Sequence, residues 1–385
     1  MSPTAPPPAD AEPTSLSEVP VATGAVLERF FDATLPVAGA ISPVVGRAAD
    51  IVADFVRLGG KRVRPMFAYA GWLAATSSPE RRPPHPEQSA ADALRVCAAL
   101  ELVQACALIH DDIIDHSDTR RGRPTVHRRF ETAHRDAGWS GDGAGHGVAA
   151  AILAGDLALA WADDLVGGHS PAGPDAGAPA PNPLPAEVSA VWAAMRTEVL
   201  GGQYLDIVNE VSGDDTVESA YRVMEFKTAA YTVARPLELG ARMAGAPAVL
   251  LDDLRSVGHD LGIAFQLRDD LLGVFGDPNR TGKPSGDDLA EGKRTALVAL
   301  SLERAEQRDP RLAAVLRDAV GRRLDDHELT RIRELLVDVG AVEEIERRVT
   351  ALLEAAVARL ERAEIGTDIR ADLIAMAGRI AHREA

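Results

Sequence analysis

The sequence Asp111-Asp112-Ile113-Ile114-Asp115 closes a long apolar run in which apolar residues recur at intervals of three and four, the spacing that predicts a helix. On a helix, Asp111 and Asp115 are four positions apart, so their carboxylates lie on one face, about 6 Å apart. Anionic side chains gathered at the end of an apolar helix are costly to remove from water. A divalent cation would offset that cost, and Mg²⁺ favours carboxylates, water and substrate phosphates. The alternative is an acidic helix end exposed to solvent.

A second acidic pair, Asp269-Asp270, lies in the apolar run 265–273, again at helical spacing. The two acidic clusters are far apart in the sequence, and hydrophobic residues frame each of them. We therefore expect two helices to face each other across one metal-filled cavity. Together with the basic clusters described below, this pattern indicates a diphosphate site.

The composition predicts a helical protein and argues against nucleic acid as a partner. The 385 residues are 46% hydrophobic and only 4% aromatic, with abundant Ala, Leu, Val, Glu and Arg, a balance that favours helices over strands. The net charge of -17 argues against nucleic acid as a partner. Both cysteines, Cys97 and Cys106, lie in the apolar run before the first acidic cluster and are interpreted as small core residues. Without a disulfide framework, the chain is predicted to be cytoplasmic.

The domain organisation follows from the low-complexity segments. Residues 1–22 are rich in Pro and Ala, lack the features of a signal or transit peptide, and are predicted to be a disordered tail. Residues 23–385 are predicted to form one all-α domain, a single large bundle of about a dozen helices around a central cavity, because no useful alternating strand pattern occurs. The stretches near 132–147 and 167–185 are interpreted as surface insertions. No transmembrane segment is predicted.

Two basic clusters flank the first acidic cluster. Lys61 and Arg64 belong to the segment 59–65, where two glycines precede a predicted helix start, and a helix N-terminus with basic side chains binds anions well. The alternative for this segment is an ordinary basic loop. Arg120 and Arg121 lie in a loop that can fold back over the metals, and Arg suits bidentate contact with phosphate.

Three lysines are further candidates for phosphate binding. Lys227 interrupts an apolar stretch and is either a phosphate ligand or a side chain that extends to the surface. The segment 276–284 fails the spacing of a P-loop and follows a helix, so it is interpreted as a flexible loop that carries Lys283 toward a phosphate. Lys293 lies in a charged segment that could instead be solvated. Asp206 either faces the same site or caps a helix.

Eight stretches carry a resemblance to a known family and occur in its order: GGKRVRP, ELVQACALIHDDIID, DTRRGRPTVH, AGD, GGQYLD, KTA, FQLRDD and GDPNRTGKPSGDDLAEGKRT. Over roughly residues 24–384 the chain resembles the trans-isoprenyl diphosphate synthases of the polyprenyl synthetase family, and most closely their bacterial geranylgeranyl diphosphate synthase branch. The resemblance implies a homodimeric prenyltransferase of isoprenoid biosynthesis. Such an enzyme condenses isopentenyl diphosphate with allylic diphosphates into an all-trans product.

The resemblance also implies roles for individual residues. The cofactor would be Mg²⁺, with three ions that draw on the allylic diphosphate until its C–O bond ionises, and backbone carbonyls near Lys227 and Thr228 would stabilise the resulting cation. The implied metal residues are Asp111, Asp115 and Asp269, with Asp112 and Asp270 in support. The allylic diphosphate would be held by Arg120, Lys227, Gln266, Lys283 and Lys293. Isopentenyl diphosphate would be held by Lys61, Arg64, Gln104 and Arg121.

The chain departs from the family pattern at Gly273, where many relatives carry the third Asp of a D-D-x-x-D motif, and Asp277 lies one turn further on. This departure puts the water shell of one metal in doubt. In the helix before the first acidic cluster, the small side chains of Val103, Cys106 and Ala107 leave the chain-length pocket open, where farnesyl-making relatives often carry bulky aromatics. We therefore predict a product longer than C15, with geranylgeranyl diphosphate (C20) as the first choice and a longer polyprenyl diphosphate as the alternative.

Two functions of other classes share part of this pattern. A class I terpene cyclase has one aspartate-rich helix, but it carries an Asn/Ser/Glu metal motif on the opposing helix, and Asn209, Ser212 and Glu218 have the wrong spacing. In a cyclase, the predicted isopentenyl diphosphate pocket of Lys61 and Arg64 would also have no substrate to bind. A non-catalytic regulatory subunit usually loses one acidic cluster, whereas both persist here. Consumption of isopentenyl diphosphate by the protein alone separates the synthase from both.

Overall fold

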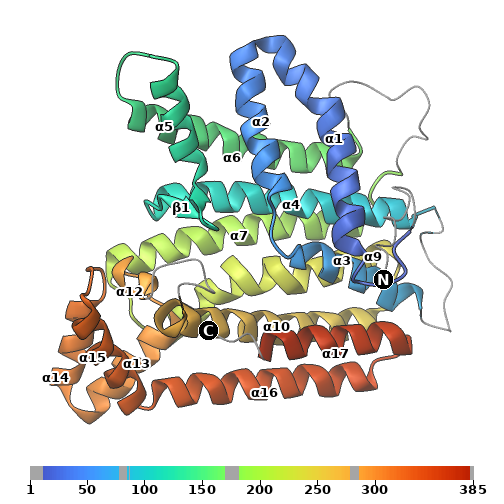
Figure 1. The fold of residues 1–385 in the computed structure, drawn as a ribbon. Helices are drawn as coiled ribbons and strands as arrows, with labels where there is room; N and C mark the ends of the chain where they lie inside the picture. The colour runs from blue at the N-terminus through green and yellow to red at the C-terminus, as the bar shows by residue number, and fades with distance from the viewer. Residues whose placement is uncertain (1–11, 78–84, 86, 170–181, 278–285, 382–385) are drawn as a thin grey trace, which may run out of the picture. The chain divides into compact units, whose positions relative to one another are not determined.

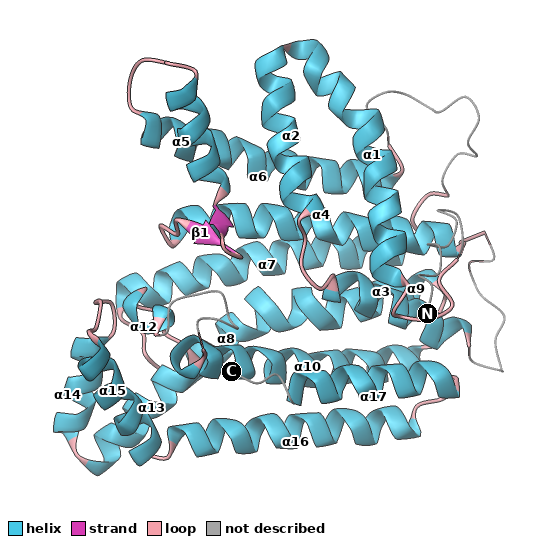
Figure 2. Ribbon diagram, viewed as in Figure 1, coloured by secondary structure: helices cyan, strands magenta, loops and turns pink. Residues whose placement is uncertain are grey.

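The protein is helical almost throughout, as Figure 2 shows, which confirms the all-α prediction. In the part of the chain that the structure describes, β-sheet is confined to a small antiparallel ribbon of β1 (Thr119–Arg120) and β2 (Arg123–Pro124). The structure is a computed structural model, and it describes residues 12–77, 85, 87–169, 182–277 and 286–381.

Contacts within the chain divide it into two compact units. Unit 1 comprises Met1–Val191 and Pro236–Pro247, and unit 2 comprises Trp192–Arg235 and Ala248–Ala385. The organisation of residues 23–385 as one domain stays a prediction.

Unit 1 is built around one buried helix, α4 (Ala90–Ile114), which carries the first acidic cluster at its C-terminal end. Helix α4 begins at a capping box, in which the side chains of Ser89 and Asp92 each accept a hydrogen bond from the other residue's backbone N–H. Most of α9 (Arg235–Met243) also belongs to this unit. The neighbours of α4 in Figure 1 are α1 (Val19–Ile41), α2 (Pro43–Arg57), α3 (Val63–Thr76), α5 (Val126–Asp136) and α6 (Gly143–Gly167).

The end of the predicted N-terminal tail is packed against unit 1. Helix α1 begins at Val19, inside the segment 1–22 that the sequence predicts as a disordered tail. Leu16 is buried, and the Tyr69 hydroxyl donates a hydrogen bond to the Pro13 carbonyl oxygen at 3.1 Å. Composition does not reveal these long-range contacts, so the predicted boundary is several residues too late. The first eleven residues lie outside the described part of the chain.

The low-complexity stretch near 132–147 is partly helical, because α5 ends and α6 begins within it. Between the two helices the chain folds over the buried His134, whose ring centroid lies 5.8 Å from that of Trp139. The sequence predicts a surface insertion here, whereas the buried His134 ties part of the stretch to unit 1. Most of the second stretch, 167–185, lies outside the described residues.

Unit 2 is built around α10 (Ala248–Phe275), which carries the second acidic pair. A π-helix, η1 (Met224–Ala234), packs along α10, and Figure 1 shows α16 (Ala341–Arg362) and α17 (Thr367–Ala381) beside it as well. The unit also contains α7 (Ala186–Ser212) from Trp192 onward, α8 (Val217–Val223), α12 (Asp287–Ala290), α13 (Ala296–Arg308), α14 (Pro310–Ala319) and α15 (Asp326–Asp338).

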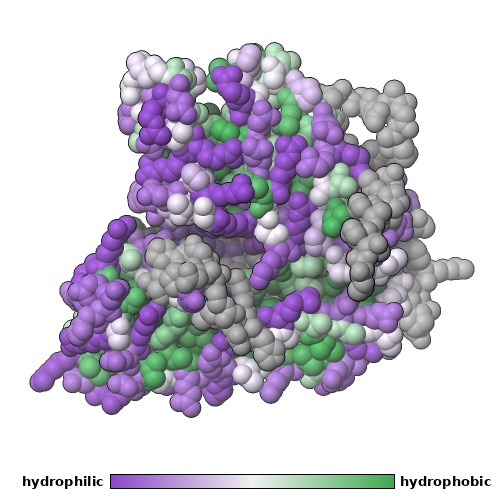
Figure 3. All heavy atoms as spheres, viewed as in Figure 1, coloured by the Kyte–Doolittle hydropathy of each residue, from purple (hydrophilic) through white to green (hydrophobic). Residues whose placement is uncertain are grey.

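The surface of unit 1 is mixed in hydropathy, while its central helix α4 is apolar and largely buried. In Figure 3 the visible face of unit 1 carries many hydrophilic residues, with apolar residues among them. By length and composition alone, α4 could cross a membrane, since its most apolar window has a mean hydropathy of 1.5, but 78% of that window is buried inside the protein. Buried core helices pass the same test, so α4 is weak evidence for a membrane segment. The predicted cytoplasmic location is not tested by these observations.

Candidate active site

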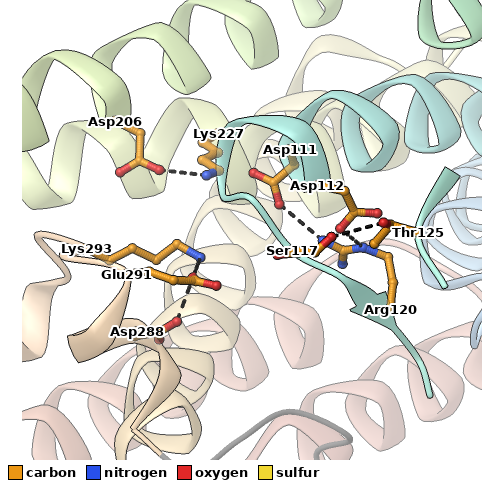
Figure 4. Close-up of polar contacts among 10 residues, drawn as sticks. All are labelled: Asp111, Asp112, Ser117, Arg120, Thr125, Asp206, Lys227, Asp288, Glu291 and Lys293. Carbon is orange, nitrogen blue, oxygen red and sulfur yellow. Dashed lines mark hydrogen bonds and ion pairs between the residues drawn. The ribbon is translucent and has the colours of Figure 1, made fainter. Parts of the chain in front are cut away.

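The C-terminal turn of α4 presents Asp111 and Asp112 to one arginine. The Arg120 Nε donates a hydrogen bond to Asp112 Oδ1 at 2.6 Å, and its Nη2 donates to Asp111 Oδ2 at 3.3 Å (Figure 4). The Asp112 side chain is only 1% exposed, so this charge-assisted contact is shielded from solvent. Asp115 is the C-cap residue that ends the helix. The structure thus brings Arg120 to the acidic cluster of α4.

The β1–β2 hairpin places Arg120 by folding back toward α4. Its turn contains Arg121, whose φ of 53° lies in the left-handed region. The Ser117 backbone N–H donates to the Asp112 carbonyl oxygen at 3.0 Å, and the Thr125 hydroxyl donates to the Ser117 carbonyl oxygen at 3.0 Å (Figure 4). The loop therefore returns over the acidic end of the helix.

The carboxylates of this turn suit a hard divalent cation. Among the described residues, no three Asp, Glu, His or Cys side chains form a group that could hold a metal ion by themselves. Mg²⁺ does not need such a group, because it usually binds one or two carboxylates and fills its shell with water and substrate phosphates. A donor set of Asp111, Asp112 and Asp115 offers only oxygen, which favours Mg²⁺ over softer metals. These residues therefore fit a Mg²⁺ ion that arrives with a diphosphate.

A buried glutamate of α4, Glu101, gathers the basic residues of unit 1. It is 7% exposed, and burial raises the pKa of its carboxyl group, while the charges of Arg64, Arg62 and Arg121 act to lower it. The Arg62 Nε lies 4.0 Å from Glu101 Oε2, and its Nη1 donates to the Pro20 carbonyl oxygen at 2.9 Å. Sequence reasoning missed Glu101 and Arg62. The available signal was one acidic residue inside an apolar helical run.

The residues that are predicted to bind isopentenyl diphosphate differ in their burial and in their contacts. Arg121 Nη1 donates to the Leu58 carbonyl oxygen at 3.3 Å, and its guanidinium lies against Gly60, where a Cβ would be 2.8 Å from Nη2. Gln104 is half-buried on α4, whereas Lys61 is exposed. The structure therefore gathers Arg64 and Arg121 around the buried glutamate and leaves Lys61 at the surface.

In unit 2, Lys227 of η1 pairs with Asp206 of α7. The Lys227 Nζ donates to Asp206 Oδ2 at 2.6 Å, and each side chain is 23% exposed (Figure 4). Asp206 therefore faces the lysine instead of capping a helix, and Lys227 is held in place instead of extending into solvent. Thr228 follows in the same π-helix, a conformation that is rare and frequently occurs at functional sites.

The second acidic pair differs in burial between its two members. Asp270 is 3% exposed, and it accepts hydrogen bonds from Gln266 Nε2 at 2.9 Å and from the Ala296 backbone N–H at 3.0 Å. Burial, aided by the charges of Asp288 and Asp269, raises the pKa of Asp270 to about 7, while the Gln266 hydrogen bond acts to lower it. A divalent cation nearby would favour the ionised carboxylate. Asp269 is half-buried, and Gln266 orients Asp270.

The segment after α10 places Lys293 between two acids. Its Nζ lies 2.5 Å from Glu291 Oε2 and 3.9 Å from Asp288 Oδ1 (Figure 4). Its backbone N–H donates to the Asp288 carbonyl oxygen at 3.0 Å. Lys293 therefore belongs to a charged cluster and not to a solvated loop. Lys283, the other lysine predicted for this region, lies outside the described residues.

The three small residues of α4 are enclosed to different degrees. Val103 and Cys106 are each 2% exposed, while Ala107 is half-buried. The Cys106 Sγ lies 3.8 Å from His110 Nδ1, and burial raises the pKa of the thiol to about 12. Ala107 is therefore the position where a larger side chain disturbs the core least.

The chain matches known proteins over most of its length. The family model for polyprenyl synthetase matches residues 47–336. A crystal structure of geranylgeranyl pyrophosphate synthase from Corynebacterium glutamicum, complexed with isoprenyl diphosphate and magnesium, is 45% identical with a TM-score of 0.86, over 96% of this chain and 100% of that chain. A geranylfarnesyl diphosphate synthase of Aeropyrum pernix is 31% identical over 303 residues, 78% of this chain and 83% of that protein. A (2E,6E)-farnesyl diphosphate synthase of Mycobacterium bovis is 32% identical over 284 residues, 72% of this chain and 67% of that protein.

Proposed function

Because the chain belongs to the polyprenyl synthetase family and is a trans-prenyltransferase, we propose that it condenses isopentenyl diphosphate with an allylic diphosphate into geranylgeranyl diphosphate (C20). The observation that carries the product length is the 45% identity to a geranylgeranyl pyrophosphate synthase over almost the whole chain. The small side chains of Val103, Cys106 and Ala107 agree with a product longer than C15. A longer polyprenyl diphosphate is the second candidate, favoured by the relative that is named for geranylfarnesyl diphosphate.

We propose Mg²⁺ as the cofactor, with three ions in each active site, because the acidic residues fit it and the solved relative is complexed with magnesium. When bound, Mg²⁺ neutralises charge on the leaving diphosphate as the allylic C–O bond breaks. The proposed ligands are Asp111, Asp115 and Asp269, with Asp112 and Asp270 in support.

Three cations of the chain are proposed to bind the allylic diphosphate: Arg120, Lys227 and Lys293. Each already contacts a carboxylate, and this contact fixes its position before the substrate arrives. Donors held in advance where charge develops stabilise the transition state without further reorganisation. Gln266 and Lys283 complete the proposed set, and the carbonyl groups near Lys227 and Thr228 are proposed to face the allylic cation.

The proposed condensation balances without a further reactant. The allylic C–O bond breaks and its electron pair leaves with the diphosphate. The double bond of isopentenyl diphosphate then forms the new C–C bond at the allylic carbon, and the proton that is lost goes to the released diphosphate. Isopentenyl diphosphate itself is proposed to bind Lys61, Arg64, Gln104 and Arg121, and the negative charge of the buried Glu101 acts on the two arginines.

Product sizing tests the proposal. Purified protein is incubated with Mg²⁺, isopentenyl diphosphate and, separately, dimethylallyl, geranyl or farnesyl diphosphate, and the hydrolysed alcohols are then sized. A single C20 alcohol is expected. A ladder of longer alcohols would assign the chain to the long-chain synthases. A cyclic hydrocarbon formed without isopentenyl diphosphate would indicate a cyclase, and no consumption of isopentenyl diphosphate by the protein alone would indicate a regulatory subunit.

Ala107→Phe is expected to shorten the product from C20 to C15, because an aromatic ring one turn before Asp111 fills space that the growing chain needs. The total rate of condensation should fall by less than about tenfold, since the diphosphate ligands are untouched. Thin-layer or gas chromatography of the alcohols measures the shift. The matched control is Ala91→Phe, the same change at an exposed position of the same helix. An unchanged C20 product from Ala107→Phe would remove this residue from the chain-length wall.

We also propose a homodimer, and α6 offers an apolar surface for it. Val148, Ile152 and Leu153 are 37%, 45% and 68% exposed on this helix, and clustered exposed apolar residues commonly mark interaction sites. Leu153→Glu is therefore expected to yield a monomer, as measured by size-exclusion chromatography with light scattering. The control Val249→Glu changes a residue that is 75% exposed on α10 and should leave the dimer intact. A Leu153→Glu protein that stays dimeric would exclude α6 as the interface.

A further inference from the structure

The space beside Gly273 on α10 is filled by a carboxylate from another segment. A Cβ built on Gly273 would lie 1.8 Å from Asp288 Oδ2 and 2.5 Å from its Cγ. Atoms that are not bonded cannot approach so closely, so the Asp288 carboxylate occupies the volume that a side chain at position 273 would fill. Asp269 and Gly273 are four positions apart and share one face of the helix. Asp288 therefore presents its carboxylate on the face of α10 that carries Asp269.

Packing of the main chain fixes the turn that carries Asp288. Helix α12 follows Gly286, whose φ of 79° suits glycine. Within α12, Leu289 is 1% exposed, and its carbonyl oxygen accepts a hydrogen bond from the Gly321 backbone N–H at 2.8 Å. The Asp288 side chain itself is 16% exposed. Its position against α10 is therefore set by an anchored turn and not only by its own rotamer.

The surroundings of Asp288 match those of a carboxylate that acts on a metal site. It is close enough to Asp270 for its charge to act on that carboxyl group. The nearby cation, Lys293, makes its shorter contact with Glu291, at 2.5 Å, and lies 3.9 Å from Asp288. Asp288 thus adds its negative charge to the acidic pair of α10.

We propose that Asp288 supplies the carboxylate that the second acidic motif lacks at Gly273, and that it orients the water shell of a Mg²⁺ ion bound with the substrate diphosphate. This inference rests on the proposed function, because the ion and the diphosphate belong to that reaction. Asp288 is a positioning residue in this arrangement and acts through water. The sequence offered Asp277, one turn after Gly273, as the nearest acidic residue, and the geometry favours Asp288 instead.

The first test is Mg²⁺ binding in the presence of inorganic diphosphate, read as the rise in melting temperature with Mg²⁺ concentration. Asp288→Asn keeps the shape of the side chain and should raise the half-saturating Mg²⁺ concentration by about tenfold or more, the usual effect of losing a group that orients a metal's ligands. Asp277→Asn is the rival variant and should leave this concentration unchanged. The reverse pattern would overturn the proposal: weaker Mg²⁺ binding by Asp277→Asn together with unchanged Mg²⁺ binding by Asp288→Asn.

The second test moves the carboxylate back to α10. Gly273→Asp alone should weaken Mg²⁺ binding, because its side chain collides with Asp288. Combining it with Asp288→Ala removes the collision and restores a carboxylate in the same place, so the double variant should bind Mg²⁺ better than either single variant. The double variant Gly273→Asn with Asp288→Ala fills the same space without a negative charge, so its Mg²⁺ binding should not recover. Equal binding by the Asp and Asn double variants would overturn the assignment, since charge at this place would then be irrelevant.

These readouts separate the inference from the proposed function. A wild-type protein that condenses the substrates, together with an Asp288→Asn variant whose Mg²⁺ dependence is unchanged, contradicts the inference alone. A wild-type protein that condenses no substrate, together with an Asp288→Asn variant with weakened Mg²⁺ binding, supports the carboxylate assignment and contradicts the synthase proposal.

Discussion

Asp111→Asn is expected to lower kcat for condensation by about 10³-fold, near the upper end of what one lost electrostatic contact at a reacting group costs. The amide keeps the size of the side chain but removes its negative charge, which weakens a proposed Mg²⁺ ligand and the charge-assisted hydrogen bond that Asp111 accepts from Arg120 Nη2 at 3.3 Å. The KM for isopentenyl diphosphate should change little, because Arg64 and Arg121 are the proposed residues for that substrate. Steady-state rates with labelled isopentenyl diphosphate measure both constants.

The matched control for this variant is Asp118→Asn, a few residues further along the same segment. The Asp118 side chain is 73% exposed and pairs with Arg128 at 2.7 Å on the surface, where such pairs contribute little to stability. The condensation rate of the Asp118→Asn variant should stay within a few-fold of the wild-type rate. If Asp111→Asn also stayed within that range while its Mg²⁺ dependence was unchanged, the carboxylate at the end of α4 would not be a metal ligand.

Local patterns located those parts of the candidate site that depend on neighbours in the sequence. The end of α4 followed from the spacing of Asp111 and Asp115 together with an apolar helical run. The return of Arg120 over that end followed from a short loop, and the structure places its guanidinium 2.6 Å from Asp112. In both cases the residues that act together are close in the sequence, so helical and loop geometry bring them together.

Long-range partners could not be predicted in the same way. Glu101 gathers arginines from two separate segments, and the sequence alone shows only an acidic residue in an apolar run. Asp288 fills the space beside Gly273, which can be recognised only once α12 is packed against α10. The N-terminal segment gave a similar error, because its Pro-rich composition hides the burial of Leu16 and the hydrogen bond from Tyr69.

Gly202→Ala is expected to reduce kcat by about 100-fold, although Gly202 bears no functional group. A Cβ at this position would lie 2.3 Å from the Lys227 backbone nitrogen and 2.7 Å from the Phe226 carbonyl carbon. Both atoms belong to the main chain of η1, so the π-helix must move away from α7 as a unit. Lys227 and the neighbouring carbonyl groups would move with it, and a misplacement of about 1 Å costs a reaction about 100-fold. The overpacking should also lower the free energy of unfolding by about 1–3 kcal/mol.

The adjacent residue provides a control that isolates this close approach. Gly201 lies on the same helix, and a Cβ added there would have nothing within 4 Å, so Gly201→Ala should keep full activity and, by restricting the unfolded chain, stabilise the protein by about 0.4–1 kcal/mol. Thermal unfolding and steady-state kinetics of the two variants give both comparisons. Loss of stability in Gly202→Ala without loss of kcat would mean that the position of η1 affects only folding. Equal behaviour of the two variants would mean that α7 can shift at no cost, and Lys227 would then need another explanation for its fixed pairing with Asp206.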